Sequence, residues 1–148
     1  MRITSSAFAP NATIPKQYTC SDKDLAPPLA FEDVPANAQS LALVVDDPDA
    51  PSGTWVHWVV YNIPPKTRGI AEGAADLGGD ALQGANDFKK RGYGGPCPPP
   101  GKPHRYFFKL YALDAMLSLP RGASKSDVET AMQGHILGHA ELIGLCSR

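Results

Sequence analysis

One carboxylate, two imidazoles and a phenol occur near the ends of apolar segments, at Asp47, His57, His104 and Tyr106. Asp47 lies in DDPDAP, where two prolines fix the backbone and set the direction of the carboxylate. Two imidazoles and a phenol supply directed hydrogen-bond donors, and a histidine beside a carboxylate stays protonated more easily. The set therefore suits a phosphate or carboxylate ligand.

Each motif alone also has an ordinary structural explanation. DPD is common in acidic turns, a lone strand histidine is usually a core or surface residue, and GGPCPPPGKPHRY fits a rigid turn. Glycines in that loop also allow backbone N–H groups to approach a ligand and to form an anion-binding concavity. Strand alternation places His104 and Tyr106 on one face. It also predicts one shared face for Trp55, His57, Val59 and Tyr61.

The elements that must position these side chains are mostly strands. Three segments rich in β-branched or aromatic residues, each bounded by breakers, predict strands: Ser40–Val45, Trp55–Ile63 and His104–Leu113. Shorter apolar pieces predict further strands and loops: Ile3–Phe8, Tyr18–Cys20 and Leu29–Phe31. Gly69–Gly101 is rich in glycine and polar residues and is expected to be a long functional loop.

One helix is expected near the C-terminus. Ser124 and Asp127 have the spacing of a capping box at its start. Apolar residues then recur at helical spacing, and Gly134 and Gly138 mark its end. The segment His139–Leu145 is expected to form a short last strand.

The composition is that of one ordinary globular domain spanning residues 1–148, with 43% apolar and 20% charged residues. A net charge of −1 argues against a nucleic-acid surface. No apolar run approaches the length of a membrane span, and no signal peptide follows Arg2, so a cytoplasmic location is expected.

The cysteines at positions 20, 97 and 146 form neither a CxxC motif nor a zinc pattern. In a cytoplasmic chain they are expected to be reduced and structural. In an oxidising compartment one pair could form a disulfide, and the sequence does not identify which pair.

DDPDAPSGTWVHWVVYNIP and GYGGPCPPPGKPHRYFFKLYALD resemble the two signature regions of the phosphatidylethanolamine-binding protein family, also called the Raf kinase inhibitor-like family. YTCSDKDLAPPLAF, ALQGANDF and HAELIGLCSR also fit its short bacterial and archaeal branch, so the resemblance covers nearly the whole chain. It implies a mainly β, Greek-key β-sandwich with a long connecting loop and a C-terminal helix followed by a short last strand.

The resemblance also implies an anion pocket. By position, the ligand-binding residues would be Asp47, His57, Gly95, Pro96, His104 and Tyr106, with Gly95 and Pro96 as loop walls. Asp49, Pro51 and Trp55 would shape the rim. Family members bind phosphate-like groups, phospholipid head groups or small anions, and many inhibit other proteins such as kinases or peptidases. Short bacterial members often form homodimers, and no cofactor is implied.

Two other functions were weighed against this binding role. A metal-assisted hydrolase would use His57, His104, Asp47 and Asp49, but the spacing lacks HExxH. An inhibitor or scaffold could act without its pocket. Because the chain also lacks a GxSxG elbow and an SxxK pair, it is expected not to be an enzyme.

Overall fold

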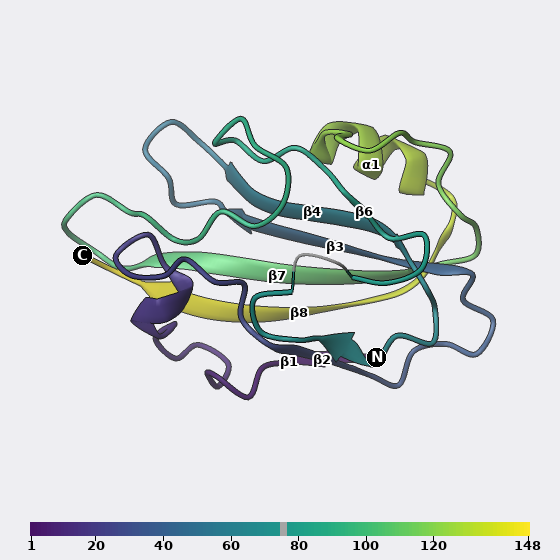
Figure 1. Ribbon diagram of the computed structural model, residues 1–148, viewed down its shortest axis with the longest axis horizontal. Coiled ribbons are helices and arrows are strands. Elements are labelled where there is room, and N and C mark those ends of the chain that lie inside the picture. The colour runs from purple at the N-terminus through teal and green to yellow at the C-terminus, as the bar shows by residue number, and fades with distance from the viewer. Residues whose placement is uncertain (75–76) are drawn as a thin grey trace.

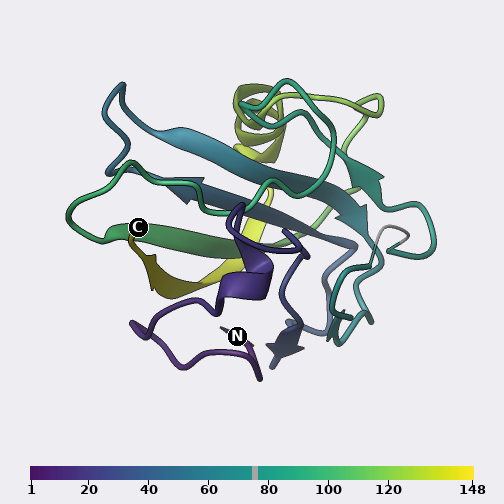
Figure 2. The ribbon, with the colours of Figure 1, turned by 60° about the vertical axis from the view of Figure 1, so that its left-hand side comes forward.

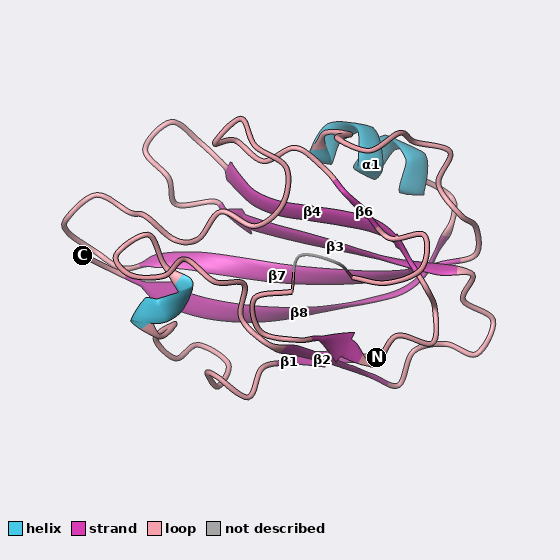
Figure 3. Ribbon diagram, in the orientation of Figure 1, coloured by secondary structure: helices cyan, strands magenta, loops and turns pink. Residues whose placement is uncertain are grey.

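The computed structural model describes residues 1–74 and 77–148. The described strands form two antiparallel sheets (Figures 1 and 3). The large sheet contains, in spatial order, β6 (Leu82–Gln83), β4 (Trp55–Ile63), β3 (Ser40–Asp47), β7 (His104–Leu113) and β8 (Ile136–Cys146). The small sheet contains β1 (Arg2–Thr4), β2 (Leu29–Glu32) and β5 (Gly69–Ile70). Two sheets in a mainly β chain confirm the expected fold class and are compatible with a Greek-key sandwich.

The strong strand patterns correspond to the central strands of the large sheet. β4 and β7 have the predicted bounds, and β3 continues two residues further, to Asp47. Every residue of β3 is buried, as an uninterrupted apolar run between two layers requires. The prediction of a strand at Tyr18–Cys20 is wrong, because Tyr18 ends a short 3₁₀ helix, η1 (Lys16–Tyr18). Ile3–Phe8 is a strand only at its start, in β1.

Apolar side chains pack on both faces of the large sheet. One cluster lies between the two sheets and includes Phe8, Trp58 and Phe108. The other lies beneath the helix α1 (Lys125–Met132), whose Val128 and Met132 are buried. The small sheet and α1 therefore cover opposite faces of the large sheet (Figures 1 and 2).

The capping box of α1 is confirmed. The Ser124 hydroxyl oxygen accepts a hydrogen bond from the backbone N–H of Asp127 (3.0 Å), and the Asp127 carboxylate accepts one from the backbone N–H of Ser124 (3.3 Å). The helix ends before Gly134, which has a positive φ of 81°.

The last strand is longer than predicted. β8 has 11 residues, includes both Gly138 and Gly144, and pairs with β7 along its length. Gly144 is needed because a Cβ there would lie 2.6 Å from a side-chain carbon of Ile14. The close approach lets the N-terminal segment 11–14 bond to the free side of β8: Asn11 N donates to Ile143 O (2.7 Å), and Ile14 N donates to Leu145 O (2.8 Å).

The long connection between β4 and β7 contains β5, β6 and an isolated antiparallel bridge between Ala85 and Arg91. Its last part, residues 94–103, lies at the same end of the large sheet as the β3–β4 turn and the C-terminus (Figure 1). Among the described residues, no helix has the length and apolarity needed to span a bilayer.

Candidate functional site

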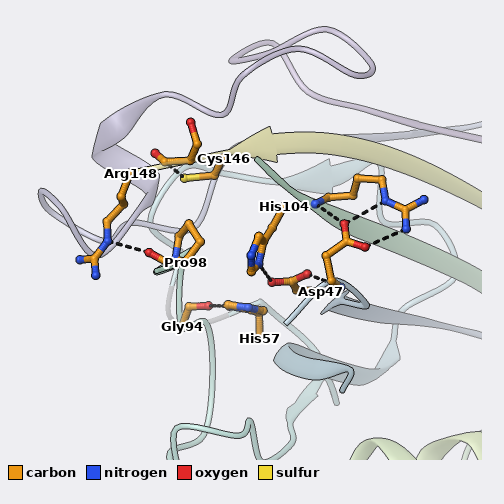
Figure 4. Close-up of polar contacts among 10 residues, drawn as sticks. Asp47, His57, Gly94, Pro98, His104, Cys146 and Arg148 are labelled. Atoms are coloured by element: carbon orange, nitrogen blue, oxygen red, sulfur yellow. Dashed lines mark hydrogen bonds and ion pairs between the residues drawn. The ribbon is translucent and has the colours of Figure 1, made fainter. Parts of the chain in front are cut away.

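Asp47 is the last residue of β3 and is almost completely buried. Its Oδ1 atom accepts a hydrogen bond from the backbone N–H of Asp49 (2.7 Å), which closes the turn after the strand. Its Oδ2 atom lies 2.7 Å from Nδ1 of His104 (Figure 4). Because a carboxylate can only accept, His104 donates from Nδ1. The backbone turn thus holds the Asp47 carboxylate in place, and the carboxylate orients the His104 imidazole.

His57 reaches the site through a β-bulge in β4. Val45 pairs with Trp58 and Asp46 pairs with Val56, so His57 is the extra residue of the bulge. The alternation predicted for β4 is therefore wrong: Trp55 and His57 line a pocket, whereas Val59 and Tyr61 pack beneath α1. A bulge reverses the alternation after it, and here it directs an imidazole to the pocket side.

The tautomer of His57 is set by the connecting loop. Its Nδ1 atom lies 2.6 Å from the carbonyl oxygen of Gly94, so Nδ1 carries the proton and donates it (Figure 4). Burial lowers the pKa of the His57 imidazole, against smaller opposing effects from the Gly94 carbonyl and the Asp47 charge. Burial therefore favours the neutral form of the ring, which has a lone pair on Nε2.

Tyr106 lies two residues after His104 on β7, on the same face. Its ring contacts the edge of the His57 ring, with the centroids 5.1 Å apart. The Tyr106 hydroxyl is buried and has no hydrogen-bond partner among residues 1–74 and 77–148. Burial, followed by the Asp47 charge, raises the pKa of this phenol, so it stays protonated and can donate.

These four side chains line one pocket of about 260 Å³. The predicted rim residues Pro51 and Trp55 also line it. The remaining walls come from residues that were not predicted to line the pocket: Ala50, Ser52, Phe88, Cys97, Pro98 and Pro99. The walls are mostly apolar, so the polar groups are concentrated at Asp47, His57, His104 and Tyr106.

Three predicted residues do not line this pocket. Gly95 donates its backbone N–H to Asp24 (2.9 Å), and Pro96 accepts from the backbone N–H of Cys20 (3.1 Å). The loop wall is instead formed by the residues that follow them, at positions 97–99. Asp49 forms a two-pronged ion pair with Arg105, which lowers the pKa of its carboxyl group to about 2.

A disulfide joins Cys20 to Cys97, which corrects the expectation that all three cysteines are reduced. Cys146 is free and buried. The two bonded cysteines are 77 positions apart, so their proximity depends on the folded loop and not on local spacing. Because Cys97 lines the pocket, the disulfide anchors the pocket wall to the segment after η1.

The described residues contain no group of three or more histidine, cysteine or acidic side chains placed to hold a metal ion. Asp47 directs its two carboxylate oxygens to the Asp49 N–H and the His104 ring. The metal-assisted hydrolase therefore has no ligand set in residues 1–74 and 77–148.

Comparison with known proteins gives a consistent result. Residues 4–147 match the family described as phosphatidylethanolamine-binding protein. A UPF0098 protein of Methanothermobacter thermautotrophicus is 52% identical, in an alignment that covers 100% of this chain and 99% of the relative's length. A UPF0098 protein of Aquifex aeolicus is 50% identical, in an alignment that covers 100% of this chain and 89% of the relative's length.

Solved structures agree with this match. A phosphatidylethanolamine-binding protein homologue of Chlamydia trachomatis superposes with a TM-score of 0.93 at 45% identity, covering 99% of this chain and 97% of its own. YbcL of Escherichia coli, described as a member of the mammalian PEBP family, superposes with a TM-score of 0.93 at 31% identity. The superposition covers 99% of this chain and 98% of YbcL. The family profile, the relatives and the folds all agree, and the chain belongs to the phosphatidylethanolamine-binding protein family, in its bacterial and archaeal branch.

Proposed function

We propose that the protein binds a small oxyanion of the phosphate or carboxylate class in the pocket lined by Asp47, His57, His104 and Tyr106. The observation that carries the proposal is the buried Tyr106 hydroxyl, which has no partner among the described residues. Buried polar groups are nearly always hydrogen-bonded, and leaving one unsatisfied costs roughly 1–3 kcal/mol. A ligand oxygen in the pocket would supply the missing partner.

The two histidines dictate how such a ligand binds. Both donate from Nδ1 to the protein, His57 to Gly94 O and His104 to Asp47 Oδ2. When neutral, each ring therefore has only a lone pair left on Nε2. A fully deprotonated oxyanion would meet two lone pairs, so binding requires a proton on the ligand or on an imidazole. Affinity should weaken as the pH rises, because that proton becomes harder to supply.

We further propose that the protein acts by binding rather than by catalysis and needs no cofactor. Its family membership supports a role as a regulator or inhibitor of other proteins, such as kinases or peptidases. A phosphorylated small molecule or a phospholipid head group would be the ligand in the cell. A cytoplasmic location and a homodimer both stay predictions, and size-exclusion chromatography with light scattering would test the dimer.

The anion pocket is tested by titrating phosphate and phosphoethanolamine into ¹⁵N-labelled protein. We expect saturable shifts at the segments around Asp47, His57 and residues 97–99, and their loss in Tyr106→Phe, which removes only the hydroxyl. Tyr111→Phe is the matched control, because Tyr111 lies on the same strand and packs against the cluster beneath α1. Unchanged affinity in Tyr106→Phe, or no shifts at millimolar ligand, would exclude this pocket as an oxyanion site.

The regulatory role needs a separate test. Ser52 is an exposed residue that lines the pocket, so Ser52→Trp should narrow the entrance without disturbing the core. Wild type and variant would be assayed as inhibitors of a panel of kinases and peptidases. Inhibition lost in the variant would place the pocket in the inhibitory interface. Equal inhibition would mean that the protein acts through another surface, and no inhibition across the panel would count against this role.

A further inference from the structure

A second cavity, of about 490 Å³, lies apart from the anion pocket and shares no lining residue with it. Its described walls come from the segment after η1, from residues 73–74 and 81, from β4 and β6, and from two turns further along the chain. The residues that matter for its chemistry are Leu25, Trp58, Leu82, Arg91, Tyr93 and Arg121. Its volume is in the range that holds small organic molecules.

Two aromatic rings contribute to one wall of this cavity. The rings of Trp58 and Tyr93 meet edge to face, with the centroids 5.3 Å apart. Their polar atoms are already bonded: Trp58 Nε1 donates to Gln83 Oε1 (2.7 Å), and the Tyr93 hydroxyl donates to Tyr18 O (2.7 Å). Because Trp58 is completely buried, the apolar surface that a ligand can reach comes from Tyr93, Leu25 and Leu82, which are half-buried.

Two arginines line the same cavity. Neither the Arg91 nor the Arg121 guanidinium forms a hydrogen bond or an ion pair within residues 1–74 and 77–148, whereas Arg105 is paired with Asp49. The Arg91 side chain passes close to the residue after Arg121, because a Cβ placed on Gly122 would lie 3.5 Å from Cδ of Arg91. Two cations that line one cavity, and that pair with no carboxylate among the described residues, favour a bound anion.

The charge around the cavity supports an anionic ligand with one acidic group. Asp24 is the acidic residue among the described residues that line it, and its Oδ1 atom is engaged by the backbone N–H of Gly95 (2.9 Å). Within residues 1–74 and 77–148, two arginines and one aspartate give the lining a formal charge of +1. A planar guanidinium pairs well with a planar carboxylate through two parallel hydrogen bonds.

We propose that this cavity is a second ligand site, which takes an organic carboxylate with a flat aromatic body. The aromatic body lies against Tyr93, Leu25 and Leu82, and the carboxylate pairs with Arg91 and Arg121. The site is independent of the oxyanion pocket, since the two cavities have separate linings.

The positions of the two tryptophans allow a direct test. Trp55 lines the oxyanion pocket and Trp58 lines the second cavity, and they are the chain's two tryptophans. Titration with naphthalene-2-carboxylate, followed by the indole N–H resonances, should shift the Trp58 signal saturably in wild type and in Tyr106→Phe alike, so that entry of the same carboxylate into the oxyanion pocket, reported by Trp55, is distinguished from binding in the second cavity. The double variant Arg91→Gln, Arg121→Gln should bind at least about tenfold more weakly.

Three controls make the outcome decisive. Arg68→Gln should bind as wild type does, because the exposed Arg68 lines neither cavity. The uncharged naphthalene-2-carboxamide should bind far more weakly than the acid. Tyr106→Phe should keep naphthalene-2-carboxylate binding, whatever happens to phosphate. A shift at Trp55 alone, no saturable shift at Trp58, equal binding of the amide, or full affinity in the double variant would overturn the proposal.

Discussion

The Nδ1 atom of His104, at the start of β7, lies 2.7 Å from Oδ2 of Asp47, at the end of β3. Both side chains are largely buried, with exposed fractions of 12% for His104 and 4% for Asp47. The pair joins two neighbouring strands at the edge of the pocket and sets which ring nitrogen of His104 carries the proton. Asp47 is thus a positioning residue, acting on a ligand through His104.

Asp47→Asn should reverse the tautomer of His104. The asparagine oxygen can still accept from the Asp49 N–H, which leaves its NH₂ group facing Nδ1 of His104. Nδ1 must then accept, and the ring proton moves to Nε2, where it can donate to a ligand. In the ¹⁵N spectrum of His104, the chemical shift typical of a protonated ring nitrogen should move from Nδ1 to Nε2. Phosphate affinity at pH 9, where an imidazole is normally neutral, should rise several-fold above wild type.

Asp49→Asn is the control for this change, because Asp49 does not line the pocket and pairs with Arg105. It should leave the His104 tautomer unchanged. Retention of the Nδ1–H tautomer in Asp47→Asn would show that the carboxylate does not set the proton position.

Tyr106→Phe should separate stability from binding. The hydroxyl has no hydrogen-bond partner of normal geometry in the described chain, although the nearby Asp47 carboxylate contributes to its raised pKa, so its removal deletes no well-formed hydrogen bond and relieves a buried unsatisfied group. The free energy of unfolding should stay the same or rise by about 1 kcal/mol, while oxyanion binding is lost. Urea unfolding without phosphate in the buffer measures the first effect. A loss of more than about 2 kcal/mol would mean that the hydroxyl has a structural role.

Stability should fall in mild acid because of His57. Burial lowers the pKa of this imidazole in the folded state, so the unfolded chain takes up the proton first. The contribution of His57 is therefore complete above the unfolded pKa of about 6.5 and is lost as the pH falls from about 7 toward 5. Urea unfolding at these pH values, in a buffer free of phosphate and carboxylate, checks this.

His57→Asn isolates the effect, because an asparagine amide can still donate to Gly94 O but cannot be protonated. The variant should lack the part of the stability loss that occurs between pH 7 and pH 5. An identical pH profile for both proteins would place the titration on another group.

Reduction of the disulfide should destabilise the protein by roughly 2–4 kcal/mol, since the bond closes a long loop in the unfolded chain. The variant Cys20→Ser, Cys97→Ser should show the same loss and should not respond to dithiothreitol. Cys146→Ala removes the free thiol and should leave the response to dithiothreitol intact. A thiol assay of the denatured, unreduced wild type should find one thiol, and three thiols would contradict the pairing.

The sequence predicted the elements that carry local signals. Segments 55–63 and 104–113 form strands because β-branched and aromatic residues run between clear breakers, and the Ser124–Asp127 spacing starts the helix where expected. Those strands bring Asp47, His57, His104 and Tyr106 to one pocket, as the combined motifs indicated.

Features that depend on pairing between distant segments were not predictable. The bulge at His57 exists only in the register between β3 and β4, so simple alternation misplaced Val59 and Tyr61. The Cys20–Cys97 disulfide and the wall at residues 97–99 depend on where the connecting loop folds back. The length of β8 was missed because Gly138 was expected to mark the end of the helix, although it pairs with Ala112 inside β8.

The backbone contacts between segment 11–14 and β8 also have a consequence for the solubility of the protein. They occupy N–H and C=O groups at the outer side of an edge strand, which would otherwise be open to a strand of another chain. A truncation or a proteolytic cut that removed residues 1–14 would expose this edge near Ile143 and Leu145. Such a protein would be prone to strand exchange and aggregation even where the pocket at the same end of the sheet kept its shape.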